Sequence, residues 1–328
     1  MTREEVLNSI QLKKRFCKDC NIPIAVFDNP YFYERLITLD TIFNCVEQFN
    51  LFCAEMQQFD NEQDYFEYYN SVKDRMISDI KGNHTYQSFN TDLSGKSETA
   101  LNIERAKVGK KNLYVENNDG KTFISIDMKK ANFSSMNFYS RDIFDCDTWE
   151  DYVGKFTNSL HIQNSKYIRQ VVLGACNPKR QIQYEHSLML KLYLHIKDTL
   201  NDNDFTAYSI GEDEILIEVG QFHHPLNKLK EVIDSCPLGI GNLVRVEMFD
   251  LQKAGDYGWL KVIYDDNQTV KFKCIDSEIF HQIVKHYYNI PITENDLVFR
   301  HNGRLARFLE EVKNPWKKLK CLCRLSLF

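Results

Sequence analysis

The segment FTAYSIGEDEILIEV, residues 205–219, is the part of this sequence that most restricts the fold. Its two flanks, FTAYSI and ILIEV, have the apolar patterns of β-strands, and GEDE between them predicts a turn. The hairpin would place Glu212, Asp213 and Glu214 together at its tip. Neighbouring carboxylates repel one another unless a cation neutralises them, so the tip favours a divalent metal ligand role for these three residues.

The overall composition limits the class of protein. A chain of 328 residues with 43% hydrophobic content can fill a substantial core, and its net charge of −5 provides no general basic field for nucleic acid. A polyanion partner would therefore have to meet a local basic patch. No apolar run is long enough to cross a bilayer and the first residues lack the apolar core of a signal peptide, so we expect a cytoplasmic protein with no membrane partner.

The ten cysteines do not form a recognisable framework. The close pairs, Cys17 with Cys20 and Cys321 with Cys323, lie at opposite ends of the chain without matching histidines, which disfavours a zinc site. We expect buried or free thiols instead.

Residues 1–81 have the pattern of a helical region. The segment DNPYFYERLITLDTIFNCVEQFNLFCAEMQQF, residues 28–59, carries apolar residues at helical spacing after Asn29 and Pro30, and predicts one long amphipathic helix. Its aromatic stripe is more typical of core packing than of a cofactor site.

Residues 82–121 are rich in Asn, Ser, Thr, Gly and Lys, which predicts a loop-rich linker or a segment like the fingers of a polymerase. Arg105, Lys107, Lys110 and Lys111 form a basic cluster here. Two interpretations remain open: a hydrated charged surface, or a mobile arm in which Arg105 and Lys107 contact the phosphates of a bound nucleotide.

The strand pattern FISIDM places Asp127 at a strand end, next to the segment KKANFSSM. A carboxylate at that position lies at the rim of a sheet, where it can bind a metal ion. The alternative is that Asp127 only caps the following helix.

A long helix is predicted from Asn177 and Pro178 to Leu200, with Ile182, His186, Met189 and Tyr193 on its apolar face. Lys179 and Arg180 occupy its first turn, where the helix dipole disfavours cations. Their position becomes favourable if they bind a triphosphate there, because backbone N–H groups and both cations then converge on one anion. The alternative is two hydrated surface residues.

The order of these elements carries a resemblance. FISIDMKKANFSSM resembles the first metal-binding motif of palm-domain nucleotidyltransferases, and YSIGEDEILIEV resembles the second acidic hairpin of reverse transcriptases and templated RNA polymerases. GEDEI is also similar to the GGDEF signature of dinucleotide cyclases. The 86 positions between Asp127 and Asp213 suit a polymerase palm better than a cyclase. Two departures are that the hairpin lacks the usual Asp-Asp pair, and that Glu212 replaces the second glycine of GGDEF.

The resemblance implies an α+β fold with an antiparallel palm-type sheet and packed helices, preceded by the helical N-terminal region. It implies that residues 122–270 form a palm-like catalytic domain in which Asp127 and Asp213 are catalytic and, with Glu212 or Glu214, hold two Mg²⁺ or Mn²⁺ ions. Phe133 and Ala131 resemble positions that inspect the nucleotide sugar. The implied function is a small nucleic-acid polymerase acting on nucleoside triphosphates and DNA or RNA.

Two alternatives remain open for the function. One is a palm enzyme without a template, of the cyclase or tRNA-His guanylyltransferase type. The other is a non-catalytic palm-like protein that binds nucleic acid or another protein.

Beyond the hairpin, residues 242–251, 258–266 and 269–275 predict three further strands, and 276–288 predicts a short helix capped by Asp276 or Ser277. The C-terminal region 271–328 ends in a basic amphipathic stretch. This tail has three interpretations: a nucleic-acid contact, a helix for a protein partner's groove, or a segment that packs on the protein itself.

Overall fold

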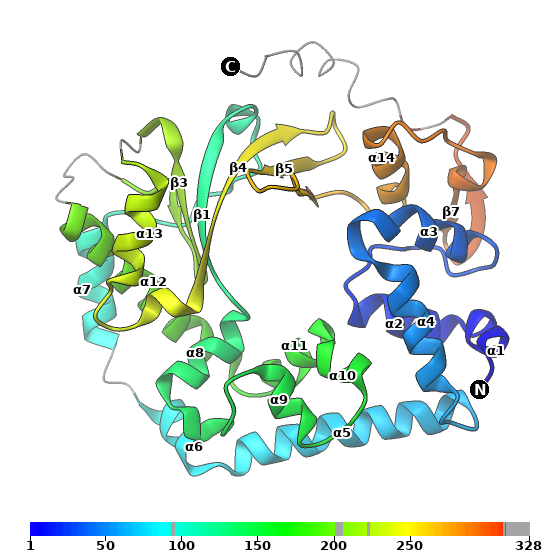
Figure 1. The fold of residues 1–328 in the computed structure, drawn as a ribbon, viewed down its shortest axis with the longest axis horizontal. Helices are drawn as coiled ribbons and strands as arrows, with labels where there is room; N and C mark the ends of the chain where they lie inside the picture. Colours follow the sequence, from blue (N-terminus) through cyan, green and yellow to red (C-terminus); the bar gives the residue numbers. More distant parts are fainter. Residues whose placement is uncertain (93–95, 201–205, 222–223, 311, 313–328) are drawn as a thin grey trace.

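The computed structural model describes residues 1–92, 96–200, 206–221, 224–310 and 312. Its elements follow one another around a ring, so that the N-terminal helices and the C-terminal elements meet on one side and the large sheet lies on the other (Figure 1). Of the predicted basic C-terminal stretch, Arg304 and Arg307 lie in a β-strand (Arg304–Arg307), and the part from Lys313 on, with Trp316 and the Cys321–Cys323 pair, lies outside the described residues.

The helical first half confirms the expected class of structure. Its helices are α1 (Arg3–Asn8), α2 (Ile10–Asp19), α3 (Tyr31–Phe43), α4 (Cys45–Met56), α5 (Glu62–Gly82), α6 (His84–Thr91) and α7 (Lys96–Ala106). The central helices are α8 (Ala131–Tyr139), α9 (Trp149–Gly154), α10 (Leu160–Asn164), α11 (Lys166–Gly174), α12 (Pro178–Leu200) and α13 (Leu226–Asp234). The strands are β1 (Thr122–Met128), β2 (Ser209–Ile210), β3 (Glu214–Glu218), β4 (Val244–Lys253), β5 (Trp259–Ile263) and β6 (Val270–Lys273), and α14 (Phe280–Tyr287), β7 (Val298–His301) and β8 (Arg304–Arg307) complete the chain.

The large sheet has the order β2-β3-β1-β4-β5-β6, and all neighbouring strands are antiparallel. The α+β class, the central strand, the acidic hairpin and the three later strands are therefore confirmed. With α12 and α13 as its connections, the first part of the sheet forms a β-α-β-β-α-β unit in the strand order 2-3-1-4.

The two faces of the sheet have different surroundings. Ile124 and Ile126 of β1 point to the face covered by α12 and α13, where they join one apolar core. Because side chains alternate along a strand, Phe123, Ser125 and Asp127 point to the opposite face. That face is turned toward the middle of the ring (Figure 1).

A second core holds the ring together. It contains the aromatic stripe of α4, with Phe49 and Phe52, and continues without interruption into α8–α11 and to Phe280 of α14. The stripe is thus core, as expected. The core does not end at residue 81, because the N-terminal helices share it with residues 133–176.

The prediction of a single helix over residues 28–59 is wrong. Asn44 adopts a left-handed conformation (φ 48°, ψ 42°) that ends α3 and starts α4. Asparagine tolerates this conformation better than most residues, since its short polar side chain can bond locally. The segment expected to be loop-rich also contains two helices, α6 and α7, of which α6 is capped by the Asn83 side chain.

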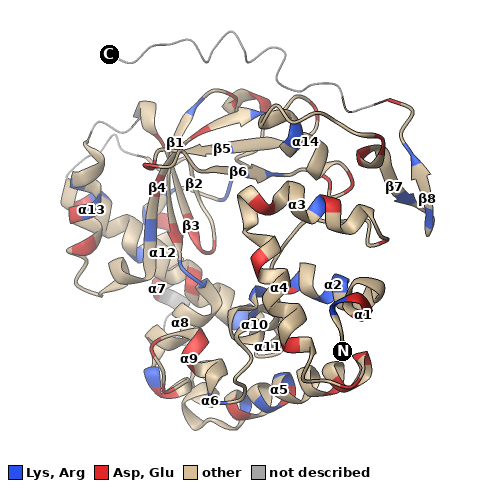
Figure 2. Ribbon diagram, turned by 45° about the vertical axis from the view of Figure 1, so that its right-hand side comes forward, with Lys and Arg blue, Asp and Glu red and all other residues tan. Residues whose placement is uncertain are grey.

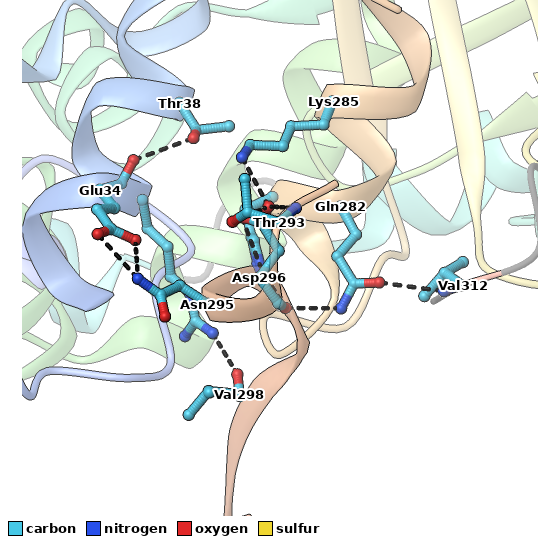
Figure 3. A network of polar contacts seen from close by, with 11 residues as sticks. Glu34, Thr38, Gln282, Lys285, Thr293, Asn295, Asp296, Val298 and Val312 are labelled. Carbon is cyan, nitrogen blue, oxygen red and sulfur yellow. Dashed lines mark hydrogen bonds and ion pairs between the residues drawn. The ribbon is translucent and has the colours of Figure 1, made fainter. Parts of the chain in front are cut away.

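The last described elements close the ring against α3 (Figure 3). Lys285 of α14 donates to the buried Asp296 carboxylate at 2.7 Å, and Asn295 donates to Glu34 of α3 at 2.9 Å. Burial alone would raise the pKa of Asp296, but hydrogen bonds from Lys285 and Thr293 lower it. Helix α14 was expected, although its N-cap is Ile279 rather than Asp276 or Ser277.

We predict that Asp296→Ala destabilises the fold by about 3 to 5 kcal/mol, because it leaves the Lys285 ammonium buried without its partner. Urea unfolding measures this loss. Asp256→Ala is the control, since the ion pair of Asp256 with Lys253 is exposed and should contribute little to stability. Equal effects of the two substitutions would contradict a stabilising role for the buried Lys285–Asp296 pair.

Candidate active site

Asp127 lies within β1 and is paired on both sides. Its residue partners across the sheet are Glu214 of β3 and Arg245 of β4. The next residue, Met128, donates its backbone N–H to the Asp213 carbonyl at 2.8 Å. The helix that follows has Lys130 as its N-cap, so Asp127 is not a helix cap. The hairpin register thus pairs Asp213 with Met128, one residue beyond Asp127.

The charge of Asp127 acts on the Asp213 carboxylate. Loss of hydration raises the pKa of Asp213, and the charge of Asp127 raises it further. Burial also raises the pKa of Asp127, although the Arg245 guanidinium, 2.6 Å from its carboxylate, opposes this change. The carboxylates of Glu214 and Glu247 also raise the pKa of Asp127, and neighbouring carboxylates of this kind gain most from a shared cation.

The three acidic residues of the hairpin have different surroundings. Glu212 forms an ion pair with Lys110 at 2.6 Å, which lowers its pKa. Glu214 accepts a hydrogen bond from Ser125 at 2.6 Å and lies 3.5 Å from Lys261. Asp213 has no such ion pair within the described chain. Asp213 is therefore the hairpin residue best placed to act with Asp127.

Glu185 of α12 is a further acidic residue that the sequence analysis missed. It is only 5% exposed, and its nearest hydroxyl donor is Ser135 at 3.4 Å. Burial, together with the charge of Asp213, raises its pKa to about 7. The adjacent His186 bonds the Gly211 carbonyl at 2.8 Å, which fixes the hairpin against α12.

The first turn of α12 differs from the expectation for Arg180. Its side chain is buried, donates from Nε to the Phe89 carbonyl at 3.0 Å and lies over the Phe89 and Tyr184 rings. It therefore neither points to solvent nor reaches toward a bound anion. Lys179 is exposed at the start of the helix and stays the candidate triphosphate ligand.

Phe133 is also placed differently from its expected role at the nucleotide sugar. It is buried in the core against Phe144 and Trp149, at ring-centroid distances of 4.8 and 6.1 Å. A side chain enclosed in this way cannot inspect a ligand.

The basic segment before β1 divides into two parts. Arg105 is exposed and pairs with Asp198 at 3.3 Å, and Lys107 is exposed in a left-handed conformation. The residues that contact the acidic hairpin come later in the chain. Ile210 of β2 donates its N–H to the Gly109 carbonyl, and Lys111 donates its N–H to the Ser209 hydroxyl. Lys110, rather than Arg105 or Lys107, is the cation nearest the hairpin tip.

The donor set limits the kind of metal site that can form. Within residues that the structure describes, no three or more His, Cys, Asp or Glu side chains gather closely enough to hold an ion by themselves. Magnesium commonly binds one or two carboxylates and completes its shell with substrate phosphates and water, which Asp127 and Asp213 would permit. Cys17 and Cys20 are free thiols whose pKa values burial raises.

Neither a family model, a characterised protein nor a solved structure matches this chain. In the described part of the chain no helix combines the length and apolar character needed to cross a membrane. Acidic and basic residues alternate over the fold without forming one dominant field (Figure 2).

We predict that Glu185→Gln removes a pH dependence of stability. The unfolded chain ionises Glu185 near pH 4.5 and the folded protein near 7, so wild-type stability falls as pH rises between these values. The free energy of unfolding of the wild type falls by about 3 kcal/mol over this range and changes little above pH 7. Urea unfolding of both proteins from pH 4.5 to 8 measures it. Parallel stability curves would show that Glu185 does not carry this proton.

Lys179→Ala and Arg180→Ala should affect different properties, ATP binding in the first and stability in the second. Arg180→Ala should cost about 2 to 3 kcal/mol, because it removes a charged hydrogen bond and the ring contacts. Lys179→Ala should change stability by less than about 0.5 kcal/mol and weaken ATP binding. Thermal unfolding and calorimetric titration with ATP separate the two effects. Unchanged ATP affinity in Lys179→Ala would remove Lys179 from the site.

Proposed function

We propose that this protein is a palm-type nucleotidyltransferase, and more narrowly a small nucleic-acid polymerase that uses Mg²⁺ or Mn²⁺. The observation that supports the proposal is the hydrogen bond from Met128, the residue after Asp127, to Asp213 at the strand-end rim of a sheet with the order 2-3-1-4, where the charge of Asp127 also acts on Asp213. The resemblance of both motifs to palm enzymes concerns the same two residues.

The reaction joins an acceptor hydroxyl to the α-phosphorus of a nucleoside triphosphate and breaks the bond to pyrophosphate. Divalent ions, when bound, polarise phosphate oxygens and lower the pKa of the attacking hydroxyl. In this chain Asp127 and Asp213 would hold them, and Lys110 would hold Glu212 away from Asp213. Glu185, with its raised pKa, would keep a proton beside Asp213 near neutral pH.

The non-catalytic alternative also has an observation in its favour. Arg245 already neutralises Asp127 at 2.6 Å, so the folded chain is electrostatically balanced there without a metal ion. A palm-like binding protein would keep this pair permanently. A polymerase would have to exchange the guanidinium for a cation when substrate binds.

We predict that purified wild-type protein incorporates labelled nucleotides on a primed template when Mg²⁺ or Mn²⁺ is added. Asp213→Asn and Asp127→Asn should each reduce the rate at least about a hundredfold, because each removes a charge that stabilises the transferring phosphoryl group. Reactions without template test the cyclase-like alternative.

Glu218→Gln is the matched control for Asp213→Asn. It makes the same change of charge at the far end of β3, where Glu218 pairs with Lys121 at 3.1 Å, and should leave the rate unchanged. A wild type without divalent-dependent transfer, with or without template, would favour the non-catalytic alternative.

A further inference from the structure

A group of lysines lies on the face of the sheet that carries Asp127. Lys261 of β5 and Lys271 of β6 are directly opposite each other, and Lys273 follows on the same face. Like charges opposite each other in a sheet are unfavourable. An arrangement of this kind is expected where the cations serve an anionic ligand.

A fourth lysine joins this group from another part of the ring. Burial lowers the pKa of Lys273, and the charges of Lys261, Lys271 and Lys166 lower it further. Lys166 is the first residue of α11, which is separated from β6 by about a hundred residues of chain. Four cations from three elements therefore act on one region. We call Lys166, Lys261, Lys271 and Lys273 the lysine cluster.

Internal acids neutralise only half of the lysine cluster. Lys261 lies 3.5 Å from Glu214, and Lys271 bonds both oxygens of Glu247 at 2.8 Å. Within the described chain, Lys166 and Lys273 have no ion pair. Two positive charges thus remain for a ligand.

The lysine cluster adjoins the candidate active site. Glu214, which Lys261 approaches, is the direct cross-strand partner of Asp127. The cluster lies on the β4–β6 side of Asp127, whereas Lys110 and the acidic hairpin lie on the β2–β3 side. A transfer reaction has two substrates. Because the two sides of Asp127 carry separate sets of cations, each set can bind a different substrate.

Lys166 also lines a cavity of about 970 Å³. The other lining residues include Asn158, Ser159 and Asn164, whose amide and hydroxyl groups can bond sugars or bases. This volume is at the upper end for a small-molecule site. Lys166 therefore belongs both to the lysine cluster and to this cavity, whose lining also includes apolar side chains and the acids Asp19 and Glu55.

We propose that the lysine cluster binds backbone phosphates of the nucleic-acid strand whose 3′ end is extended at Asp127 and Asp213. This rests on the proposed function and specifies its acceptor substrate as a polynucleotide. Phosphate is the shared chemistry of a strand and a nucleoside triphosphate. The strand is favoured because the cluster spans β5, β6 and α11, and because Lys166 also lines the cavity.

The test is the affinity of the full chain for a fluorescein-labelled duplex with a recessed 3′ end, measured by anisotropy without metal over a series of salt concentrations. The double substitution Lys166→Gln with Lys273→Gln should weaken binding at least about tenfold and lower the salt slope by about 2. Lys228→Gln with Lys230→Gln makes the same charge change on α13, on the opposite face, and should change neither quantity. Asp213→Asn should bind the duplex at least as tightly as wild type.

Each result decides between the proposals. If the two double variants lose affinity equally, or if wild type does not bind the duplex, the strand site is overturned. If Lys166→Gln with Lys273→Gln weakens ATP binding and leaves duplex binding unchanged, the cluster is a triphosphate site and the proposal is again overturned. Lysine-dependent duplex binding without nucleotide incorporation would support the strand site while rejecting the proposed function. If wild type incorporates nucleotides but the lysine substitutions leave duplex binding unchanged, the proposed function is supported and the strand site is overturned.

Discussion

The pairing of β1 with both of its neighbours is the constraint on which the candidate site depends. Asp127 lies opposite Glu214 on one side and Arg245 on the other, and the Met128 N–H bonds the Asp213 carbonyl. A shift of one residue in either register would turn Asp127 into the apolar core beneath α12. The buried Ile124 and Ile126 fix that register, so packing on one face positions Asp127 and Glu214 on the other.

The site concentrates charge that the fold balances locally. Arg245, Lys110 and Lys261 each neutralise a different carboxylate, while Asp213 and the buried Glu185 keep raised pKa values. Ionising both of these acids without a cation is unfavourable, so a divalent ion should bind most favourably where pH has already removed their protons. The acids of the hairpin repel one another and favour a bound cation. The lysines of the lysine cluster repel one another and favour a bound anion.

The sequence predicted what depends on local pattern. The strand at 122–128, the acidic hairpin and the strands after it follow from alternation and turn residues, and the structure has them all. Asn302-Gly303 was a missed signal of the same kind, because both residues have positive φ in the tight turn between β7 and β8.

The remaining features depend on contacts between distant segments. The sequence analysis assigned Ile182 to the apolar face of α12, but Ile182 is exposed. Gln181 and Glu185 are buried instead. Their spacing with Leu188 and Leu192 also fits a helix face, but the sequence shows no reason to bury a glutamate. Arg180 was misplaced because its partner, the Phe89 carbonyl, is 91 residues away.

The central claim is that Asp127 and Asp213 together bind a divalent cation with substrate phosphate. Electron paramagnetic resonance of Mn²⁺, titrated into the protein with a non-hydrolysable nucleoside triphosphate, measures this most directly. The account predicts saturable binding beyond that of the nucleotide alone, which is lost when both aspartates are replaced by asparagine and retained in Glu218→Gln. Identical Mn²⁺ binding by wild type and the double asparagine variant would contradict it.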